Sequence, residues 1–488
     1  MPWYPLECYL STHHGPTEAP KDGDTAARGR RRLYLAVVAT YFGTVSTGLT
    51  CAYSSPALPD MRRTMHISDD FAAWFGALVL AGGLVAGVIS GHLLSMAGRR
   101  GTMLMSAAWF AAGWLFIAFA NSTTLLFVGR FLTGGGMSVA SAASTVFVAE
   151  VTPANLRGAL NTGCNFVETV GILIGYTMGK WLNYKWLAAA CLVPAVINGA
   201  TFLFYVRESP MWLLQKGRRK EAMEALRFYR GPRIEAEFAA LETCTVDVTT
   251  KLTFGDLKEP YVYKSFLCSL LTLLMQQGSA ISVLIFFAQD ILQEADVSIA
   301  ADDCTIVVGG ILSVAFLVAT VLADKAGRKW LFIVSTASSA ISLAVLGVCF
   351  YMKQTKNQHF HDNYGWLPLA SMSVYFAGYS LGLGPLPFVY VGELLPLKTK
   401  GVATAVCIVL YYCFGFLVTK TYTDLSRLMG TAAAYWLYAS FLAVTFVLFV
   451  IYVPETKAKT LDEIERYFGK KLPSPQLSNI DEVVTSHL

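Results

Sequence analysis

The chain has 488 residues, of which 55% are hydrophobic and only 15% carry a charge, and its mean hydropathy is +0.49. Soluble globular proteins are about one quarter charged, so this composition excludes an ordinary soluble domain. The net charge of +5 is explained by Lys and Arg residues that face anionic lipid head groups, so no nucleic-acid partner is expected.

Apolar runs long enough to cross a membrane recur along the whole chain. A bilayer core of about 30 Å requires about 20 apolar residues per helix, and we predict an all-α integral membrane protein with about twelve such helices. In the first half the predicted spans are 33–56, 71–94, 102–120, 123–148, 159–180 and 186–206. In the second half they are 264–290, 304–323, 330–352, 366–392, 402–424 and 431–453.

A charged segment at 207–263 separates the two sets of six spans. It combines charge with a helical period in "RRKEAMEALRFYR", which predicts a cytosolic linker of short amphipathic helices. The predicted organisation is a polar tail (1–32), a six-helix bundle (33–206), this linker, a second six-helix bundle (264–453) and a C-terminal tail (454–488).

Lys and Arg residues fall on alternate connections between the spans. Because such cations are retained on the cytosolic side, both termini are predicted to be cytosolic, although Arg62 and Arg63 go against the trend. The N-terminal tail lacks the apolar core of a cleaved signal peptide. The ten cysteines are scattered without a C-x-x-C pair, so neither a disulfide framework nor a metal site is expected.

Three charged motifs occur once in each half, in the same order. They are "AEVTPANLRG" (149–158) and "GELLPLKTKG" (392–401), "AGRR" (97–100) and "AGRK" (326–329), and "RESP" (207–210) and "PETK" (454–457). An ordered repeat of this kind indicates two pseudo-symmetric bundles, which can rock about a binding site at the membrane midplane.

All three motifs fall at predicted cytosolic ends of spans, which suggests a cytosolic gate. Glu150 and Glu393 could pair with cations from neighbouring helix ends, each pair contributing about 1 kcal/mol, and several pairs together would bias a two-state equilibrium. The alternative is that the charges only mark helix ends, but topology does not require acids at matched places. The predicted gate residues are Arg99, Arg100, Arg130, Glu150, Arg157, Glu208, Asp324, Arg328, Glu393, Lys400 and Glu455.

The motifs together resemble the sugar porter family of the major facilitator superfamily. The resemblance runs from "YSSPALP" (53–59) through "GRFLTGGG" (129–136) and "QQGSAIS" (276–282) to "SLGLGPLPFVYVGELLP" (380–396) and "PETKAKTLDEIE" (454–465). Within the family the chain looks most like the animal facilitative glucose transporters and the arthropod facilitated trehalose transporters. That likeness implies a monomeric uniporter of a neutral sugar, trehalose or a hexose, in the plasma membrane, with no cofactor.

A sugar site needs neutral amides and hydroxyls together with aromatic faces. Gln276 and Gln277 lie deep in an apolar span, where they would be costly unless they faced a polar site; interhelical hydrogen bonding is the alternative role. The resemblance implies sugar contact for this pair and for matching positions elsewhere. The predicted substrate-binding residues are Asn165, Gln276, Gln277, Ser282, Ser313, Gly384, Phe388 and Tyr412.

Several of these positions depart from the family pattern. Ser282 and Ser313 stand where the family has Asn, and Phe388 replaces the usual Trp. Tyr411 and Tyr412 occupy the usual Asn-Trp place, "FF" (286–287) the usual Tyr pair, and Ser95 the place of an Asp that its repeat keeps as Asp324. In "GPLPF" (384–388) two prolines remove backbone donors and are predicted to break the tenth helix.

Proton coupling is an alternative to uniport. Proton-coupled sugar porters place an Asp in the first span, where this chain has Ser54, which favours uniport. Glu168, however, lies inside the fifth span one turn after Asn165, and an intramembrane acid is a candidate proton site. A further alternative is a sugar sensor that binds without transporting. No nucleophile and base pair, metal spacing or phosphate loop indicates an enzyme.

Overall fold

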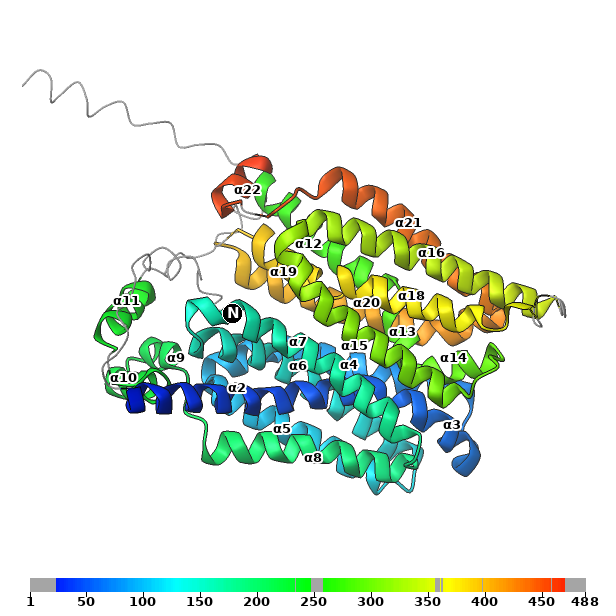
Figure 1. Ribbon diagram of the computed structural model, residues 1–488, viewed down its shortest axis with the longest axis horizontal. Coiled ribbons are helices and arrows are strands. Elements are labelled where there is room, and N and C mark those ends of the chain that lie inside the picture. Colours follow the sequence, from blue (N-terminus) through cyan, green and yellow to red (C-terminus); the bar gives the residue numbers. More distant parts are fainter. Residues whose placement is uncertain are drawn as a thin grey trace, which may run out of the picture.

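The computed structural model describes residues 23–232, 234–246, 258–355, 360, 363–396, 398–457 and 459–469. These residues are almost entirely helical, and they form no strand. Figure 1 shows the long helices side by side, with the helices of the first half in the lower part of the view and those of the second half above them.

Each bundle follows the predicted order of spans. The N-terminal bundle contains α2 (Gly23–Ala52), α3 (Ser54–Met65), α4 (Asp69–Met96), α5 (Gly98–Ala118), α6 (Thr123–Val151), α7 (Ala154–Gly179) and α8 (Tyr184–Phe204). The C-terminal bundle contains α12 (Pro260–Gly278), α13 (Ile281–Phe286), α14 (Ala288–Glu294), α15 (Ala301–Ala326), α16 (Arg328–Gln354), α18 (Leu367–Leu381), α19 (Leu386–Leu394), α20 (Lys400–Met429) and α21 (Thr431–Tyr452).

Eleven helical segments of the described chain are long and apolar enough to span a membrane, so this is a multi-pass membrane protein. The two broken helices each supply one of them, as Pro260–Phe286 and Leu367–Leu394. The predicted fifth span is present as α7, but it is not among the eleven. The reason lies in its sequence, "ALNTGCNFVETV", where amides, hydroxyls and one acid interrupt the apolar run.

The segment between the bundles contains three short helices, α9 (Pro210–Gln215), α10 (Arg219–Arg230) and α11 (Glu235–Val246). They lie at the end of the molecule where α2 begins, as does α22 (Leu461–Tyr467) after the last span (Figure 1). That end also carries the charged motifs, and we call it the motif end. Helix α10 buries Ala222, Ala225, Leu226 and Tyr229, as the helical period predicted.

Small residues let helices of one bundle approach closely. At Gly134 of α6 an added Cβ would lie 2.0 Å from the carbonyl oxygen of Val79 in α4, so only glycine permits this contact. The two bundles meet along α4 with α20 and along α7 with α15. Residues from α4, α7, α13 and α20 therefore face one another at the centre of the molecule.

Candidate functional site

The two predicted amides lie at the break of the seventh span. Helix α12 ends at Gly278, and Ala280 has a left-handed backbone (φ 61°) before α13 starts. Gln276 donates from Nε2 to the Tyr379 hydroxyl at 3.0 Å and to the Gly384 carbonyl oxygen at 2.9 Å. Its Oε1 is buried without a hydrogen-bond partner, which leaves one acceptor for a ligand.

Gln277 is buried beside Gln276 and contacts a different helix. Its Oε1 accepts a hydrogen bond from Ser282 Oγ at 3.0 Å, so the shorter side chain at this position still reaches the amide. Gln277 packs against Gly415 of α20. A Cβ added at Gly415 would lie 2.8 Å from the Cδ of Gln277, so the glycine makes room for the amide. The sequence did not predict that these two predicted site residues bond each other.

The tenth span is broken where the prolines predicted it. Helix α18 ends at Leu381 and α19 starts at Leu386, and the carbonyl of Gly384 in the gap is the one that Gln276 binds. Because the helix is interrupted, that oxygen is free of intrahelical bonding. The two helix breaks thus meet at Gln276.

The predicted aromatic site residues come from α19 and α20, and Phe388 is 48% exposed. Phe388 packs edge-on against Tyr411, with ring centroids 5.5 Å apart. Tyr412 is buried, and its ring fits against Gly83 of α4, where an added Cβ would lie 2.6 Å from it. Tyr412 is therefore a contact between the two bundles. Tyr379 was missed by sequence reasoning, since an aromatic residue in an apolar span gives no signal of its own.

The remaining predicted substrate residues differ in their bonding. Ser313 is buried and donates to the Gly309 carbonyl of its own helix at 3.0 Å, so its proton is already used. Asn165 is partly exposed on α7, the helix that packs against α15. Glu168 lies one turn further along, and the two side chains share a face of α7.

Away from the motif end, polar contacts join the two bundles. Arg62 of α3 pairs with Asp290 of α14 at 2.6 Å, and Arg427 of α20 pairs with Asp70 of α4 at 2.7 Å. Lys180 at the end of α7 also pairs with Asp303 of α15. The position of Arg62, unexpected from the distribution of cations, is explained by its acidic partner in the other bundle.

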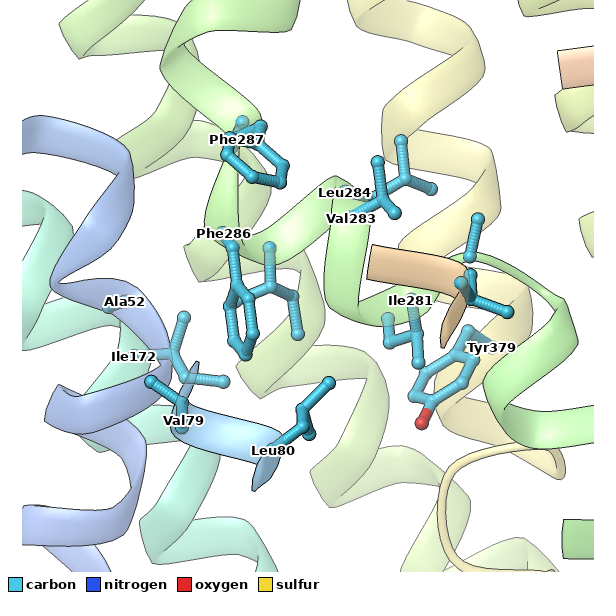
Figure 2. Close-up of a cluster of buried hydrophobic side chains, with 14 of the residues drawn as sticks. Ala52, Val79, Leu80, Ile172, Ile281, Val283, Leu284, Phe286, Phe287 and Tyr379 are labelled. Atoms are coloured by element: carbon cyan, nitrogen blue, oxygen red, sulfur yellow. The ribbon is translucent and has the colours of Figure 1, made fainter. Parts of the chain in front are cut away.

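Apolar side chains pack beneath these ion pairs. Figure 2 shows Phe286 of α13 beside Ile172 of α7 and Val79 of α4. Tyr176 of α7 adds a hydrogen bond from its hydroxyl to the Ile285 carbonyl at 2.8 Å. The bundles are therefore in contact at the end opposite the motifs, which we call the closed end.

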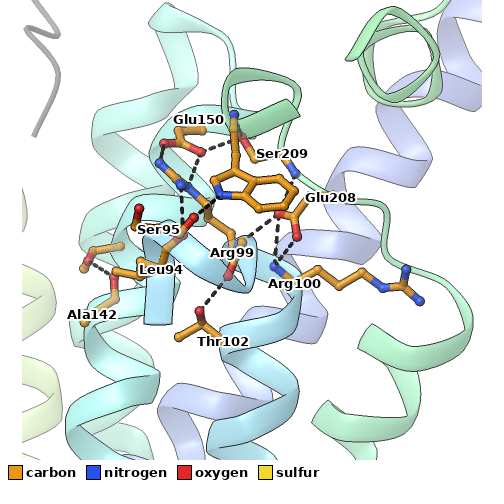
Figure 3. Close-up of polar contacts among 12 residues, drawn as sticks. Leu94, Ser95, Arg99, Arg100, Thr102, Ala142, Glu150, Glu208 and Ser209 are labelled. Carbon is orange, nitrogen blue, oxygen red and sulfur yellow. Dashed lines mark hydrogen bonds and ion pairs between the residues drawn. The ribbon is translucent and has the colours of Figure 1, made fainter. Parts of the chain in front are cut away.

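At the motif end, the first copies of the charged motifs form one cluster inside the N-terminal bundle (Figure 3). Arg99 donates from Nε to Glu150 at 2.8 Å, and Ser209 donates to the same carboxylate at 2.5 Å. Arg100 points the other way and donates to the Phe202 carbonyl at 2.9 Å. Ser209 belongs to the "RESP" motif, which was its only sequence signal.

Glu208 caps the start of α5 with its carboxylate. It accepts backbone N–H groups from Arg99 at 2.9 Å and from Arg100 at 3.1 Å. Gly98 lies directly beneath it with φ +77°, and an added Cβ would lie 2.3 Å from Glu208 Oε2. Burial raises the pKa of Glu208, although these N–H groups and Arg99 oppose the rise.

The second copies form a matching cluster in the C-terminal bundle. Arg328 pairs with Glu393 at 2.8 Å, as Arg99 does with Glu150. Glu455 accepts the N–H groups of Arg328 at 3.2 Å and Lys329 at 3.0 Å. Burial raises the pKa of Glu455, but its bonds from four backbone N–H groups outweigh burial and hold the pKa below its ordinary value.

The predicted pairing of both glutamates is confirmed, and each pair forms within one bundle. Arg130 was wrongly assigned to this group. It lies 20 residues before Glu150 in α6, about 30 Å away along the helix axis at 1.5 Å per residue. It donates to Ser54 Oγ at 2.6 Å and to the Thr50 carbonyl at 3.2 Å.

Two further predicted gate residues lie in the first turns of helices. Arg157 is in the first turn of α7, and Lys400 starts α20 and interacts electrostatically with Glu393. The side chain of Asp324 lies outside the described residues.

A cleft of about 600 Å³ opens at the closed end, lined by polar groups from α3, the α7–α8 connection and α14. Its lining includes Asp60, Lys180 and Asp302. It shares no lining residue with the group around Gln276, so we do not assign the sugar site to it.

Comparison with known proteins identifies the family. The model of the family "Sugar (and other) transporter" matches residues 11–468. The chain is 34% identical to the facilitated trehalose transporter Tret1 of Culex quinquefasciatus over 444 residues, 88% of this chain and 85% of that protein. It is also 34% identical to Tret1 of Apis mellifera ligustica over 446 residues, 89% and 88% of the two chains. It spans 54% of the longer Tret1 of Aedes aegypti, at 33% identity.

Solved structures show the same fold. The inward-open xylose transporter XylE from E. coli superposes with a TM-score of 0.75 at 22% sequence identity, covering 89% of this chain and 99% of that one. The partially occluded inward-open form of the same transporter superposes with a TM-score of 0.73. With the family model over most of the chain and these relatives together, the chain belongs to the sugar transporter family.

Proposed function

We propose that the protein is a uniporter that moves a neutral sugar, trehalose or a hexose, across the plasma membrane by alternating access, with both termini in the cytosol. The observation that carries the proposal is the buried acceptor of Gln276, held between two broken helices where the bundles meet. The Tret1 relatives favour trehalose among the sugars.

The surroundings of Arg130 support uniport over proton coupling. Its guanidinium bonds the hydroxyl of Ser54 and backbone carbonyls, so among the described residues it pairs with no carboxylate. The specific observation in favour of coupling is Glu168, an acid inside the bundle. The two candidates differ in whether a proton gradient drives uptake.

The test is uptake of radiolabelled trehalose and glucose into proteoliposomes, with and without an inward proton gradient. We expect saturable entry of at least one sugar that the gradient leaves unchanged. Accumulation driven by the gradient would replace uniport by symport, and binding without entry would indicate a sensor.

The motif clusters are proposed to act as the cytosolic gate. The motif end would close when the opposite end of the molecule opens. Glu393→Gln removes one charge of the Arg328 pair, which lies at 2.8 Å. A loss of about 1 kcal/mol would change the populations of the two states roughly fivefold, so the maximal uptake rate should fall severalfold while expression stays normal. Unchanged uptake would leave these charges with a helix-end role alone.

A further inference from the structure

The cleft at the closed end lies between the two bundles, apart from the sugar site around Gln276. One wall comes from α3 and the connection between α7 and α8, and the other comes from α14, the connection after it and the start of α15. Its volume of about 600 Å³ is within the range of about 300–1,000 Å³ that small-molecule sites occupy. The cleft can therefore hold a ligand that touches both bundles at once.

Direct contacts between the bundles hold the two walls together. The backbone N–H of Gln289, in the wall from α14, donates to Ser55 Oγ of α3 at 3.0 Å. Lys180, in the opposite wall, pairs with Asp303 of α15. Opening of the closed end separates the bundles and breaks both contacts, so the cleft has both of its walls only in the closed conformation.

The charges in the cleft nearly cancel. Its described lining includes three carboxylates and two cations, which are those of Asp60, Asp296 and Asp302 and of Arg63 and Lys180. A ligand with charge of one sign would be attracted by some of these groups and repelled by others. The lining therefore favours a neutral ligand that binds through hydrogen bonds.

The lining offers the kinds of group that bind a saccharide. Trp181 supplies an aromatic ring and is 70% exposed. Gln293 is exposed and supplies an amide whose side chain bonds none of the described residues. Asp60 accepts the Tyr184 N–H with its Oδ2 at 2.9 Å and has a second carboxylate oxygen for a ligand. Aromatic faces suit the C–H groups of a sugar ring, while amides and carboxylates suit its hydroxyls.

We propose that this cleft is a second binding site, for a neutral saccharide, and that a saccharide bound there keeps the closed end closed. Because the open conformation lacks one wall, binding favours the closed conformation by linkage. At about ten times the dissociation constant of the cleft, the ratio of closed to open protein rises about elevenfold. The binding is independent of the proposed function. The inhibition of transport rests on that function, since a carrier that cannot open this end does not turn over.

The experiment measures exchange and conformation of the full-length protein in proteoliposomes. Trehalose, or D-glucose, is present at equal concentration on both sides of the membrane, so the orientation of the inserted protein does not affect the result. We expect the exchange rate of at least one radiolabelled sugar to pass through a maximum and then fall severalfold as its concentration rises. Spin labels on α3 and α14 should show a larger fraction of the closed distance at the same high concentrations.

One variant in each wall tests the cleft itself. Trp181→Ala and Gln293→Ala should abolish both the fall in rate and the change in distance, while the KM stays as in the wild type. Trp186→Ala is the matched control. Trp186 lies at the start of α8 and is 68% exposed, but it is outside the described lining, so this variant should keep both effects.

Exchange that saturates without a fall for both sugars would overturn the inference, as would a fall that survives in Trp181→Ala and Gln293→Ala. If neither sugar exchanges, the proposed function fails, and the label distances decide on the cleft. A sugar-dependent change of distance in the wild type that is absent from both wall variants then supports the second site. Any other pattern of distances overturns it.

Discussion

The Oε1 atom of Gln276 is a buried acceptor without a partner, although the Nε2 atom of the same amide makes two hydrogen bonds. Such an acceptor is costly when unpaired, and a sugar hydroxyl can satisfy it. The amide is also held in place by its own donors, so its oxygen is presented in a fixed direction. At this point of the site the Gln276 Oε1 atom therefore selects a ligand group that can donate a hydrogen bond.

Gln276→Ala should raise the KM for the transported sugar about tenfold, because a ligand hydrogen bond worth about 1.4 kcal/mol is lost. Uptake kinetics in proteoliposomes measure it. Ser342→Ala is the control, since the Ser342 hydroxyl only binds the Ser338 carbonyl of its own helix at 2.8 Å. A wild-type KM in Gln276→Ala would remove this residue from the sugar site.

Gly98→Ala should destabilise the protein. The left-handed backbone of Gly98 costs a residue with a Cβ about 1–2 kcal/mol, and the added Cβ would lie 2.3 Å from Glu208 Oε2. We expect a lower apparent melting temperature in detergent. Gly310→Ala is the matched control, because an added Cβ there has no atom within 4 Å. Equal melting temperatures for the two variants would contradict the role given to Gly98.

At the scale of elements, the start of α16 depends on Glu455, as the start of α5 depends on Glu208. Each carboxylate binds the first N–H groups of a helix, where the helix dipole favours negative charge. Their pKa values nevertheless shift in opposite directions, upward for Glu208 and downward for Glu455. The two bundles should therefore respond differently to acid.

The pKa of Glu455 in the folded protein lies below the ordinary value of about 4.3, so its stabilisation is present above that value and is lost as the pH falls through the folded-state pKa. Glu455→Gln should lower the melting temperature at neutral pH, and the gap to the wild type should narrow on acidification. For Glu208→Gln the gap in melting temperature to the wild type should instead widen on acidification. The pKa of Glu208 is raised, so its protonated form is favoured in the folded protein. If the melting temperatures of Glu455→Gln and the wild type changed in parallel with pH, the lowered pKa given to Glu455 would be wrong.

The sequence predicted helices wherever the apolar period was continuous, and it predicted the break of the tenth span from Pro385 and Pro387. It did not predict the break of the seventh span, because the residue with the left-handed backbone is Ala280, a residue type that rarely adopts it, and not Gly278, where α12 ends. The unusual polarity of α7 was visible in the sequence, yet its consequence depends on what α7 faces. Packing with α15 supplies that information and local sequence does not.

The site was predictable to a similar extent. The amides were found because polar residues are rare in apolar spans, and the acids were found because they repeat. Arg130 was misplaced because its position along α6 was judged from its motif and not from its distance to the helix end. Tyr379 and the bond between Gln277 and Ser282 depend on tertiary contacts, which one sequence does not encode in a readable pattern.

At the scale of the whole molecule, four ion pairs of the described residues join the bundles at the closed end, since Arg427 pairs with both Asp69 and Asp70. The motif clusters, in contrast, are each contained in one bundle. Among the ion pairs between the bundles, the pair of Arg62 and Asp290 is the least exposed on average, with side-chain exposures of 35% and 17%. Opening that end must separate these charges. The pairs thus favour the conformation described here.

Asp290→Asn should shift the population toward the conformation open at that end about fivefold, since a pair of this kind contributes about 1 kcal/mol. Distances between spin labels placed on α3 and α14 measure the shift. Glu221→Gln, which breaks an exposed pair within α10, should leave the distances unchanged. A distance distribution identical to wild type in Asp290→Asn would show that apolar packing alone holds the closed end.

The ion pairs at the closed end also differ from the motif clusters in their access to electrolyte. Arg427 and Asp70 have side chains 47% and 63% exposed, whereas Arg99 in the motif cluster is 3% exposed. Dissolved salt weakens the attraction between exposed charges, with a Debye length of about 8 Å under physiological conditions, and it affects buried pairs much less. The resting orientation of this carrier should therefore respond more strongly to the ionic strength of the medium on the side of the closed end than on the side of the motif end.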